Sequence, residues 1–250
     1  MLPGIDDGPA TIEDSIALVR AAEASGTRAM VATSHVSWRY PNDAATIALL
    51  VDELNERLSE EGIAVEIFPG AEIATTRMEE IAPEELKCLH LGDGPWILLE
   101  PPFTPVTTGL GAVVASLQNA GHRVVLAHPE RCPALLREPQ IVQSLVGGGV
   151  LMSITASSLV GRFGGEVRRF ARRLVEDRLV HNVASDAHDT IKRPPGMVQE
   201  LQAAGLGELS DWLTNAVPAA ILSGEDIPAR PQTSPNTRVR PRRRMRFRRR

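Results

Sequence analysis

The chain has 250 residues, of which 43% are hydrophobic and 23% are charged, and it carries a formal net charge of −4. This length suits one large core, and the absence of any apolar run near the roughly 20 residues that span a bilayer excludes a transmembrane segment. No basic stretch leads into an apolar one at the start, so we expect a cytoplasmic protein, and Cys88 and Cys132 are too few for a disulfide framework.

The charge is unevenly distributed along the chain. Residues 227–250 contain ten arginines and no acid, and because the whole chain carries −4, the other 226 residues carry −14. A body this acidic repels phosphate backbones, so no specific nucleic-acid binding is expected. The arginine-rich segment lacks apolar periodicity, which predicts a disordered tail that contacts polyanions or an acidic membrane surface.

Helices and short apolar strands alternate after a turn-rich opening loop over residues 2–9. Helix caps, helical spacing of apolar residues and glycine stops predict helices over 11–26, 42–62, 75–90, 111–119, 133–149 and 163–177, with two or three short ones within 194–223. Runs rich in β-branched residues predict strands over 29–34, 64–71, 96–99, 124–127, 150–155 and 180–188. Six alternations in a row predict a parallel α/β sheet.

Five of the six strands lead into side chains that commonly bind metals. These side chains are His35, Glu72, Glu100, His128 and the pair Asp186 and His188. The carboxyl ends of barrel strands meet on one face, so we expect the five ends to converge. Alternation along a strand also predicts that Asp186 and His188 point to the same side and reach one ion. Imidazole and carboxylate without thiolate suit Mn²⁺, Zn²⁺, Fe²⁺ or Mg²⁺.

Several motifs along the chain resemble those of one enzyme superfamily. They are GIDDGP at 4–9, TSH at 33–35, PGAE at 69–72, LLE at 98–100, AHPER at 127–131 and ASDAH at 184–188. Together they resemble the polymerase and histidinol phosphatase (PHP) superfamily, most of all the manganese-dependent protein-tyrosine phosphatases of bacterial capsule and exopolysaccharide loci. The resemblance covers residues 1–226 as one domain and implies a distorted (β/α)₇ barrel, with 227–250 as a separate tail.

The resemblance also implies which residues hold metal. One ion would take Glu72, Glu100 and His128, and a second would take Asp7, His35 and His188. A third would take Asp186, a bridging Glu72 and two histidines of a His-x-His motif on the first barrel strand. That motif is absent from this sequence. We therefore expect the first strand to be missing from this chain and two metal ions to bind, most readily Mn²⁺, rather than three.

Four residues are candidates for the chemistry itself. Arg131 and Arg193 match positions that bind phosphate in the family, and a guanidinium fork fits two phosphate oxygens. Asp186 and His188 complete the candidate catalytic set, with His188 or His35 as a proton donor to the leaving tyrosine. The implied reaction is metal-assisted hydrolysis of phosphotyrosine on a bacterial tyrosine kinase.

Alternative functions remain open at this point. A different phosphoester, such as histidinol phosphate, is one alternative, and a catalytically impaired, metal-binding regulatory protein is another because two ligands are absent. A cysteine-dependent phosphatase is excluded, since only four residues separate Cys132 from Arg137 where that loop needs five. No phosphate-binding P-loop motif occurs. The sequence leaves the oligomeric state open, including a homo-oligomer.

Overall fold

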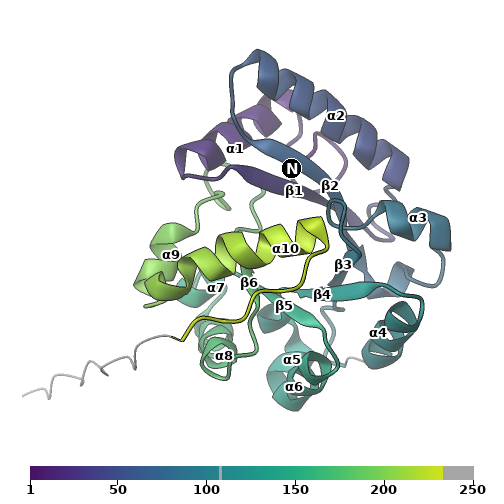
Figure 1. Ribbon diagram of the computed structural model, residues 1–250, viewed down its shortest axis with the longest axis vertical. Helices are drawn as coiled ribbons and strands as arrows, with labels where there is room; N and C mark the ends of the chain where they lie inside the picture. Colours follow the sequence, from purple (N-terminus) through teal and green to yellow (C-terminus); the bar gives the residue numbers. More distant parts are fainter. Residues whose placement is uncertain (107–108, 233–250) are drawn as a thin grey trace, which may run out of the picture.

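The computed structural model describes residues 1–106 and 109–232, and it is built on a single parallel sheet. Six strands lie in the order in which they occur in the sequence, each paired in parallel with the next. The sheet curls into a half-barrel, with helices along its outer side (Figure 1). The parallel α/β sheet predicted from the strand–helix alternation is confirmed.

The elements follow one another with short connections. The strands are β1 (Ala29–Val36), β2 (Glu66–Ala74), β3 (Trp96–Glu100), β4 (Arg123–Ala127), β5 (Leu151–Thr155) and β6 (Asn182–Ala184). The α-helices are α1 (Ile12–Ala24), α2 (Ala44–Glu60), α3 (Pro83–Cys88), α4 (Leu110–Asn119), α5 (Pro133–Arg137), α6 (Pro139–Gly147), α7 (Ala156–Val160), α8 (Gly165–Glu176), α9 (Val198–Ala203) and α10 (Val217–Ser223). Short 3₁₀ turns lie at Thr75–Arg77, Pro129–Arg131 and Gly207–Leu209, and a π-helical turn at Trp212–Ala216 precedes α10.

Helix α2 shows how the sequence produces these elements. The Asp43 side chain accepts a hydrogen bond from the backbone N–H of Thr46 at 2.8 Å and so caps the first turn. The buried side of the helix repeats at helical spacing and consists of Ile47, Val51, Leu54 and Leu58. This apolar side packs on β1 and β2 (Figure 1), so burial of aliphatic side chains stabilises both layers.

Helix α10 crosses the molecule near the amino ends of the strands (Figure 1), opposite the carboxyl ends where functional residues were expected. The loop before β3 passes very close to it. A Cβ atom built at Gly94 would lie 2.0 Å from the backbone oxygen of Ile221, so this approach requires glycine. The contact fixes the end of the half-barrel that lies away from the candidate ligands.

The half-barrel is open between its outermost strands. Among the described residues, β1 pairs only with β2, and β6 pairs only with β5. A cavity of about 890 Å³ lies inside the sheet and reaches both edges, and Met30, Val183 and Leu222 contribute to its lining. The carboxyl-end residues His35, Glu72, His128, Asp186 and His188 line the same cavity.

Three expectations about the elements need correction. The helix expected over 75–90 is a 3₁₀ turn followed by the six-residue α3. The strand expected over 180–188 is only three residues long and ends at Ala184. A short helix that was not expected, α7, follows β5 directly. None of the helices in the described ranges is long and apolar enough to cross a membrane.

The chain keeps contacting the body beyond residue 226, where the domain was expected to end. Ile227 packs against the core, and the carbonyl of Pro228 accepts a hydrogen bond from the indole N–H of Trp212 at 2.9 Å. Arg230 donates to the carbonyl of Val175 at 3.2 Å and lies over the Trp212 ring. The rest of the expected tail, residues 233–250, lies outside the described part of the chain.

Candidate metal centre

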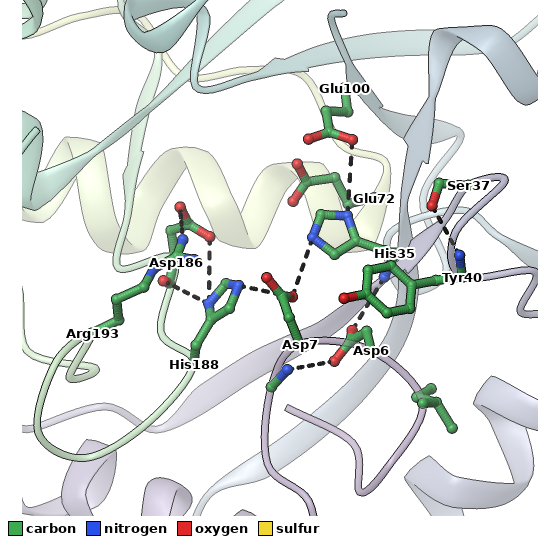
Figure 2. Close-up of polar contacts among 12 residues, drawn as sticks. Asp6, Asp7, His35, Ser37, Tyr40, Glu72, Glu100, Asp186, His188 and Arg193 are labelled. Atoms are coloured by element: carbon green, nitrogen blue, oxygen red, sulfur yellow. Dashed lines mark hydrogen bonds and ion pairs between the residues drawn. The ribbon is translucent and has the colours of Figure 1, made fainter. Parts of the chain in front are cut away.

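The expected ligands of the first three strands meet at the carboxyl edge of the sheet. His35 of β1 lies beside Glu72 of β2 in the strand register, and Glu100 is the last residue of β3, beside Ala74. Figure 2 shows the side chains of Glu72 and Glu100 on one side of the His35 ring and Asp7 on the other. Parallel pairing in sequence order therefore brings three separate strand ends to one place.

Two overlapping sets of side chains could each hold a cation. Asp7, His35 and His188 form one set, and His35, Glu72 and Glu100 form the other; in each, one donor atom from every residue lies within 4.8 Å of the others. The Asp7 carboxylate is 3.5 Å from His35 Nε2 and 3.3 Å from His188 Nε2. The first set is the one that the family resemblance implied for the second metal.

His128 adjoins the second set. Its Nε2 lies 2.6 Å from a carboxylate oxygen of Glu72 and 4.0 Å from one of Glu100, and its Nδ1 is buried without a partner in the described residues. Burial opposes the charged form of His128, but the Glu72 carboxylate outweighs it and raises the pKa of the imidazole. Burial, followed by the charge of Glu72, raises the pKa of Glu100. The neighbouring carboxylates of Glu72 and Glu100 would therefore be stabilised by a positive charge placed between them.

The loops after β4 and β6 position their ligands through left-handed backbone. His128 has φ 31° and Asp186 has φ 52°, values that non-glycine residues rarely adopt. The expected alternation of Asp186 and His188 along a strand is therefore wrong, because the strand has ended and the backbone has turned. The two residues are nevertheless close: Nδ1 of His188 lies 3.0 Å from the carbonyl oxygen of Asp186 (Figure 2).

This contact orients the His188 ring. A carbonyl oxygen can only accept, so Nδ1 carries the proton and donates it to the Asp186 carbonyl. Nε2 then faces the Asp7 carboxylate at 3.3 Å. A histidine oriented in this way suits metal coordination better than proton donation.

Asp186 also binds both candidate phosphate-binding arginines. Its carboxylate pairs with the guanidinium groups of Arg131 and Arg193. Burial alone would raise the pKa of Asp186, but Arg193, then His128 and Arg131, hold that pKa below its usual range. The two arginines therefore reach one point at the edge of the site, from the loops after β4 and β6.

Aromatic rings surround this arrangement. The Arg131 guanidinium lies 5.5 Å from the ring centre of Phe103 and 4.6 Å from that of Phe163. The Phe103 ring also stacks on His128, with centroids 5.4 Å apart, and Tyr40 stacks on His35 at 5.7 Å. These aromatic residues were not predicted to belong to the site. They lie far apart in the chain, and no motif indicates that they meet around the histidines and Arg131.

Two acids that sequence reasoning did not single out support the ligands. Asp6 accepts hydrogen bonds from the backbone N–H groups of Gly8 at 2.9 Å and His35 at 3.2 Å, and so ties the opening loop to β1. Glu130 is fully buried and accepts from the Thr155 N–H and the Ser158 hydroxyl. Asp6 lies in the GIDDGP motif and Glu130 in the AHPER motif, so these two motifs contained a signal for both residues.

Comparison with known families identifies the chain. The family model described as "Capsular polysaccharide synthesis, CpsB/CapC" matches residues 1–204. The chain belongs to the CpsB/CapC family. Tyrosine-protein phosphatase YwqE of Bacillus subtilis is 38% identical over 194 residues, which cover 77% of this chain and 76% of the relative. A putative tyrosine-protein phosphatase CapC of Staphylococcus aureus is 31% identical over 197 residues, covering 78% and 76%.

A solved structure agrees with the family assignment. It belongs to work on YwqE from Bacillus subtilis and CpsB from Streptococcus pneumoniae, described as unique metal-dependent tyrosine phosphatases. The match has a TM-score of 0.79 at 33% sequence identity, and it covers 93% of this chain and 97% of the other. The CpsB/CapC chain described here therefore shares its curled α/β fold with a metal-dependent enzyme.

Proposed function

We propose that this protein is a metal-dependent protein-tyrosine phosphatase. The observation that carries the proposal is the pair of donor sets that share His35 at the carboxyl edge, beside two arginines that meet on Asp186. Relatives named tyrosine-protein phosphatases, at up to 38% identity, support the substrate class. The substrate is a phosphotyrosine protein, and a bacterial tyrosine kinase is the one we expect.

The donor set fits divalent cations. It contains carboxylate oxygens and imidazole nitrogens without sulfur, as Mn²⁺, Mg²⁺, Fe²⁺ or Zn²⁺ prefer. The unpartnered, buried Nδ1 of His128 and the raised pKa of Glu100 are independent signs that the polar groups here lack their full complement of partners. Asp7, His35, Glu72, Glu100, His128 and His188 would hold the ions, with Asp186 as a further candidate. We propose Mn²⁺ as the preferred metal.

The side chains of this protein would orient the phosphate. When bound, divalent ions supply positive charge that polarises phosphate oxygens and activates water. Arg131 and Arg193 would bind phosphate oxygens as a pair of forks, exchanging part of their contact with Asp186 for the substrate. The Phe103 ring, half exposed beside Arg131 and His128, would contact the substrate's aromatic ring and help to exclude water.

We propose a PHP-type barrel in which one more strand would lie between β1 and β6. Within residues 1–106 and 109–232, β1 and β6 each have one edge without a partner strand, and these edges and the cavity of about 890 Å³ between them support it.

The direct test is hydrolysis of a phosphotyrosine peptide with and without added Mn²⁺. We expect turnover that a chelator removes and Mn²⁺ restores. Glu100→Gln removes a carboxylate from the donor set of His35, Glu72 and Glu100, and it should lower kcat by about a hundredfold or more. Glu84→Gln on the exposed side of α3 is the matched control and should leave turnover unchanged.

The outcomes separate the alternatives. Histidinol phosphate turned over in preference to phosphotyrosine would assign another phosphoester. Tight Mn²⁺ binding in calorimetry without turnover of either compound would favour a metal-binding regulatory protein. Full activity of Glu100→Gln in excess Mn²⁺ would show that the donor set is not the catalytic site.

A further inference from the structure

A second, smaller cavity adjoins the candidate metal centre. It has a volume of about 230 Å³ and lies between the loop that follows α7 and the loop that leads into α9. Its lining includes the cations of Arg162, Lys192 and Arg193, together with the hydroxyl groups of Ser157 and Ser185. On a body that carries −14 overall, three cations around one cavity form a local positive patch.

A side-chain cap on the Asp189 loop builds one wall of this cavity. The Asp189 carboxylate accepts hydrogen bonds from the backbone N–H groups of Ile191 at 2.7 Å and of Lys192. The N–H of His188 donates to the carbonyl of Arg193 at 3.0 Å and closes the loop. The loop therefore has a defined shape, and Lys192 and Arg193 are presented from it together.

Two of the three cations are available to a ligand. Within the described part of the chain, neither Arg162 nor Lys192 has a carboxylate oxygen within 4.0 Å of its charged nitrogens. Arg162 instead donates to the carbonyl of Lys192 at 3.1 Å, which holds its guanidinium at the cavity. With Arg193 paired to Asp186, the cavity lining contains two cations without an ion pair in the described residues and the single carboxylate of Glu200, while the Asp189 carboxylate on the same loop offsets part of the Lys192 charge.

The cavity is continuous with the groups proposed to bind the scissile phosphate. Arg193 lines the cavity and contacts Asp186, and Phe163 lines it and lies 4.6 Å from the Arg131 guanidinium. Ser185 lines both this cavity and the larger one that contains the metal ligands. A peptide whose phosphotyrosine occupies the metal centre would therefore place a neighbouring side chain within reach of the smaller cavity.

We propose that this cavity, which we call the second anion site, binds an acidic side chain of the substrate, a carboxylate or a second phosphate, close in sequence to the phosphotyrosine. The inference rests on the proposed phosphatase function and adds a substrate preference to it. Arg162 and Lys192 provide the attraction. Glu200 lowers this attraction, because its carboxylate lines the same cavity.

The test is a set of phosphotyrosine peptides that differ in one residue. Glutamate replaces glutamine at each position in turn within about three residues of the phosphotyrosine, a reach of about 10 Å in an extended chain. A second set carries phosphoserine at the same positions. We expect at least one position at which the acidic residue raises kcat/KM, and we expect added salt to reduce the gain.

Charge-neutral variants locate the effect. Arg162→Gln and Lys192→Gln should each reduce the gain by about two- to fivefold, as for a partly exposed ion pair, and leave turnover of the neutral peptide unchanged. Glu200→Gln should enlarge the gain. Arg169→Gln, an exposed charge on α8 that does not line the cavity, is the matched control and should have no effect.

Each result decides the inference. A gain with glutamate assigns the site to carboxylates as well, and a gain with phosphoserine alone assigns it to phosphate. Equal kcat/KM for neutral and acidic peptides, or a gain that survives both Arg162→Gln and Lys192→Gln, overturns the second anion site while the phosphatase stands. No turnover of any peptide overturns the proposed function and the site with it.

Discussion

Arg131 combines two kinds of contact that only a guanidinium can make together. Its flat group lies near the rings of Phe103 and Phe163, and its N–H groups pair with Asp186. An ammonium group would keep the charge but lose both the fork and the planar stacking. The residue is therefore held in one orientation before substrate arrives, which reduces the entropy cost of binding phosphate.

Replacing either candidate phosphate-binding arginine by lysine should therefore impair the enzyme. We expect Arg131→Lys and Arg193→Lys each to lower kcat/KM for a phosphotyrosine peptide by about tenfold or more. Steady-state kinetics in excess Mn²⁺ measures this, with Arg169→Lys as the control. Kinetics unchanged in both variants would leave the two arginines as structural partners of Asp186.

His181 should make the fold sensitive to acid. Burial, followed by the charge of Arg230, lowers the pKa of His181 from 6.5 to about 4. Its Nδ1 accepts a hydrogen bond from the Met152 N–H at 3.1 Å, which requires the neutral ring. As pH falls below 6.5, the His181 imidazole binds a proton in the unfolded chain but stays neutral in the folded chain. The contribution of His181 to the free energy of unfolding is thus complete above pH 6.5 and is lost toward pH 4, a change of roughly 3 kcal/mol.

The measurement is urea unfolding at several pH values between these limits. His181→Gln keeps an acceptor for the Met152 N–H but cannot take up a proton, so its stability should depend less on pH than that of the wild type. His90 and His122, whose pKa values burial also lowers, remain in both proteins and cancel in the comparison. Parallel curves for the two proteins would contradict the assignment.

The loop between α3 and β3 depends on a backbone contact with α10. Gly94→Ala would place a methyl group 2.0 Å from the Ile221 carbonyl oxygen, so one of the two elements must move. We expect the free energy of unfolding to fall by about 1–3 kcal/mol. Gly147→Ala, at the exposed end of α6 with no atom within 4 Å of the new Cβ, is the control and should be neutral or slightly stabilising. Equal stabilities in thermal unfolding would mean that the loop adapts without cost.

The elements themselves were largely predictable from sequence. Caps such as Asp43 and apolar repeats such as Ile47 to Leu58 act locally, so the pattern predicts the helix directly. Strands β1 to β5 were also predicted near their observed positions, because each is a short run of apolar residues between turn signals. The ligand pair after β6 was different. There, the strand was expected to continue to His188, but pairing with β5 stops at Ala184, and periodicity does not report where a partner strand ends.

The convergence of side chains was only partly predictable. Strand ends meet in any parallel sheet, so the grouping of His35, Glu72 and Glu100 followed from the order of elements. The stacking of Phe103 on His128 depends on a loop conformation instead, and no pattern in the chain encodes it. The roles of the individual ligands stay predictions until metal binding is measured.

The molecule as a whole includes part of the segment expected to be a tail. We compare a chain that ends after residue 226 with one that ends after residue 232. The shorter chain loses Ile227, the acceptor for the Trp212 indole and the contact of Arg230 with Val175. Each lost hydrogen bond contributes about 0.5–1.5 kcal/mol, so the midpoint of the shorter chain in calorimetry should be several degrees lower. Equal midpoints would show that residues 227–232 add no stability.

The left-handed backbone of His128 and Asp186 has a consequence for engineering and for evolution. Glycine adopts these angles without the strain that a side chain brings, so replacement by glycine would relieve a local cost of about 1 kcal/mol or more at each position. The same replacement would remove the ion pairs of Asp186 with Arg131 and Arg193, or the contact of His128 with Glu72, and breaking a buried pair costs more than the strain. The strained backbone is therefore maintained by the contacts that form the site, so libraries built from this protein should hold both residues fixed, and a natural copy with glycine at either one would have lost the strain and the site together.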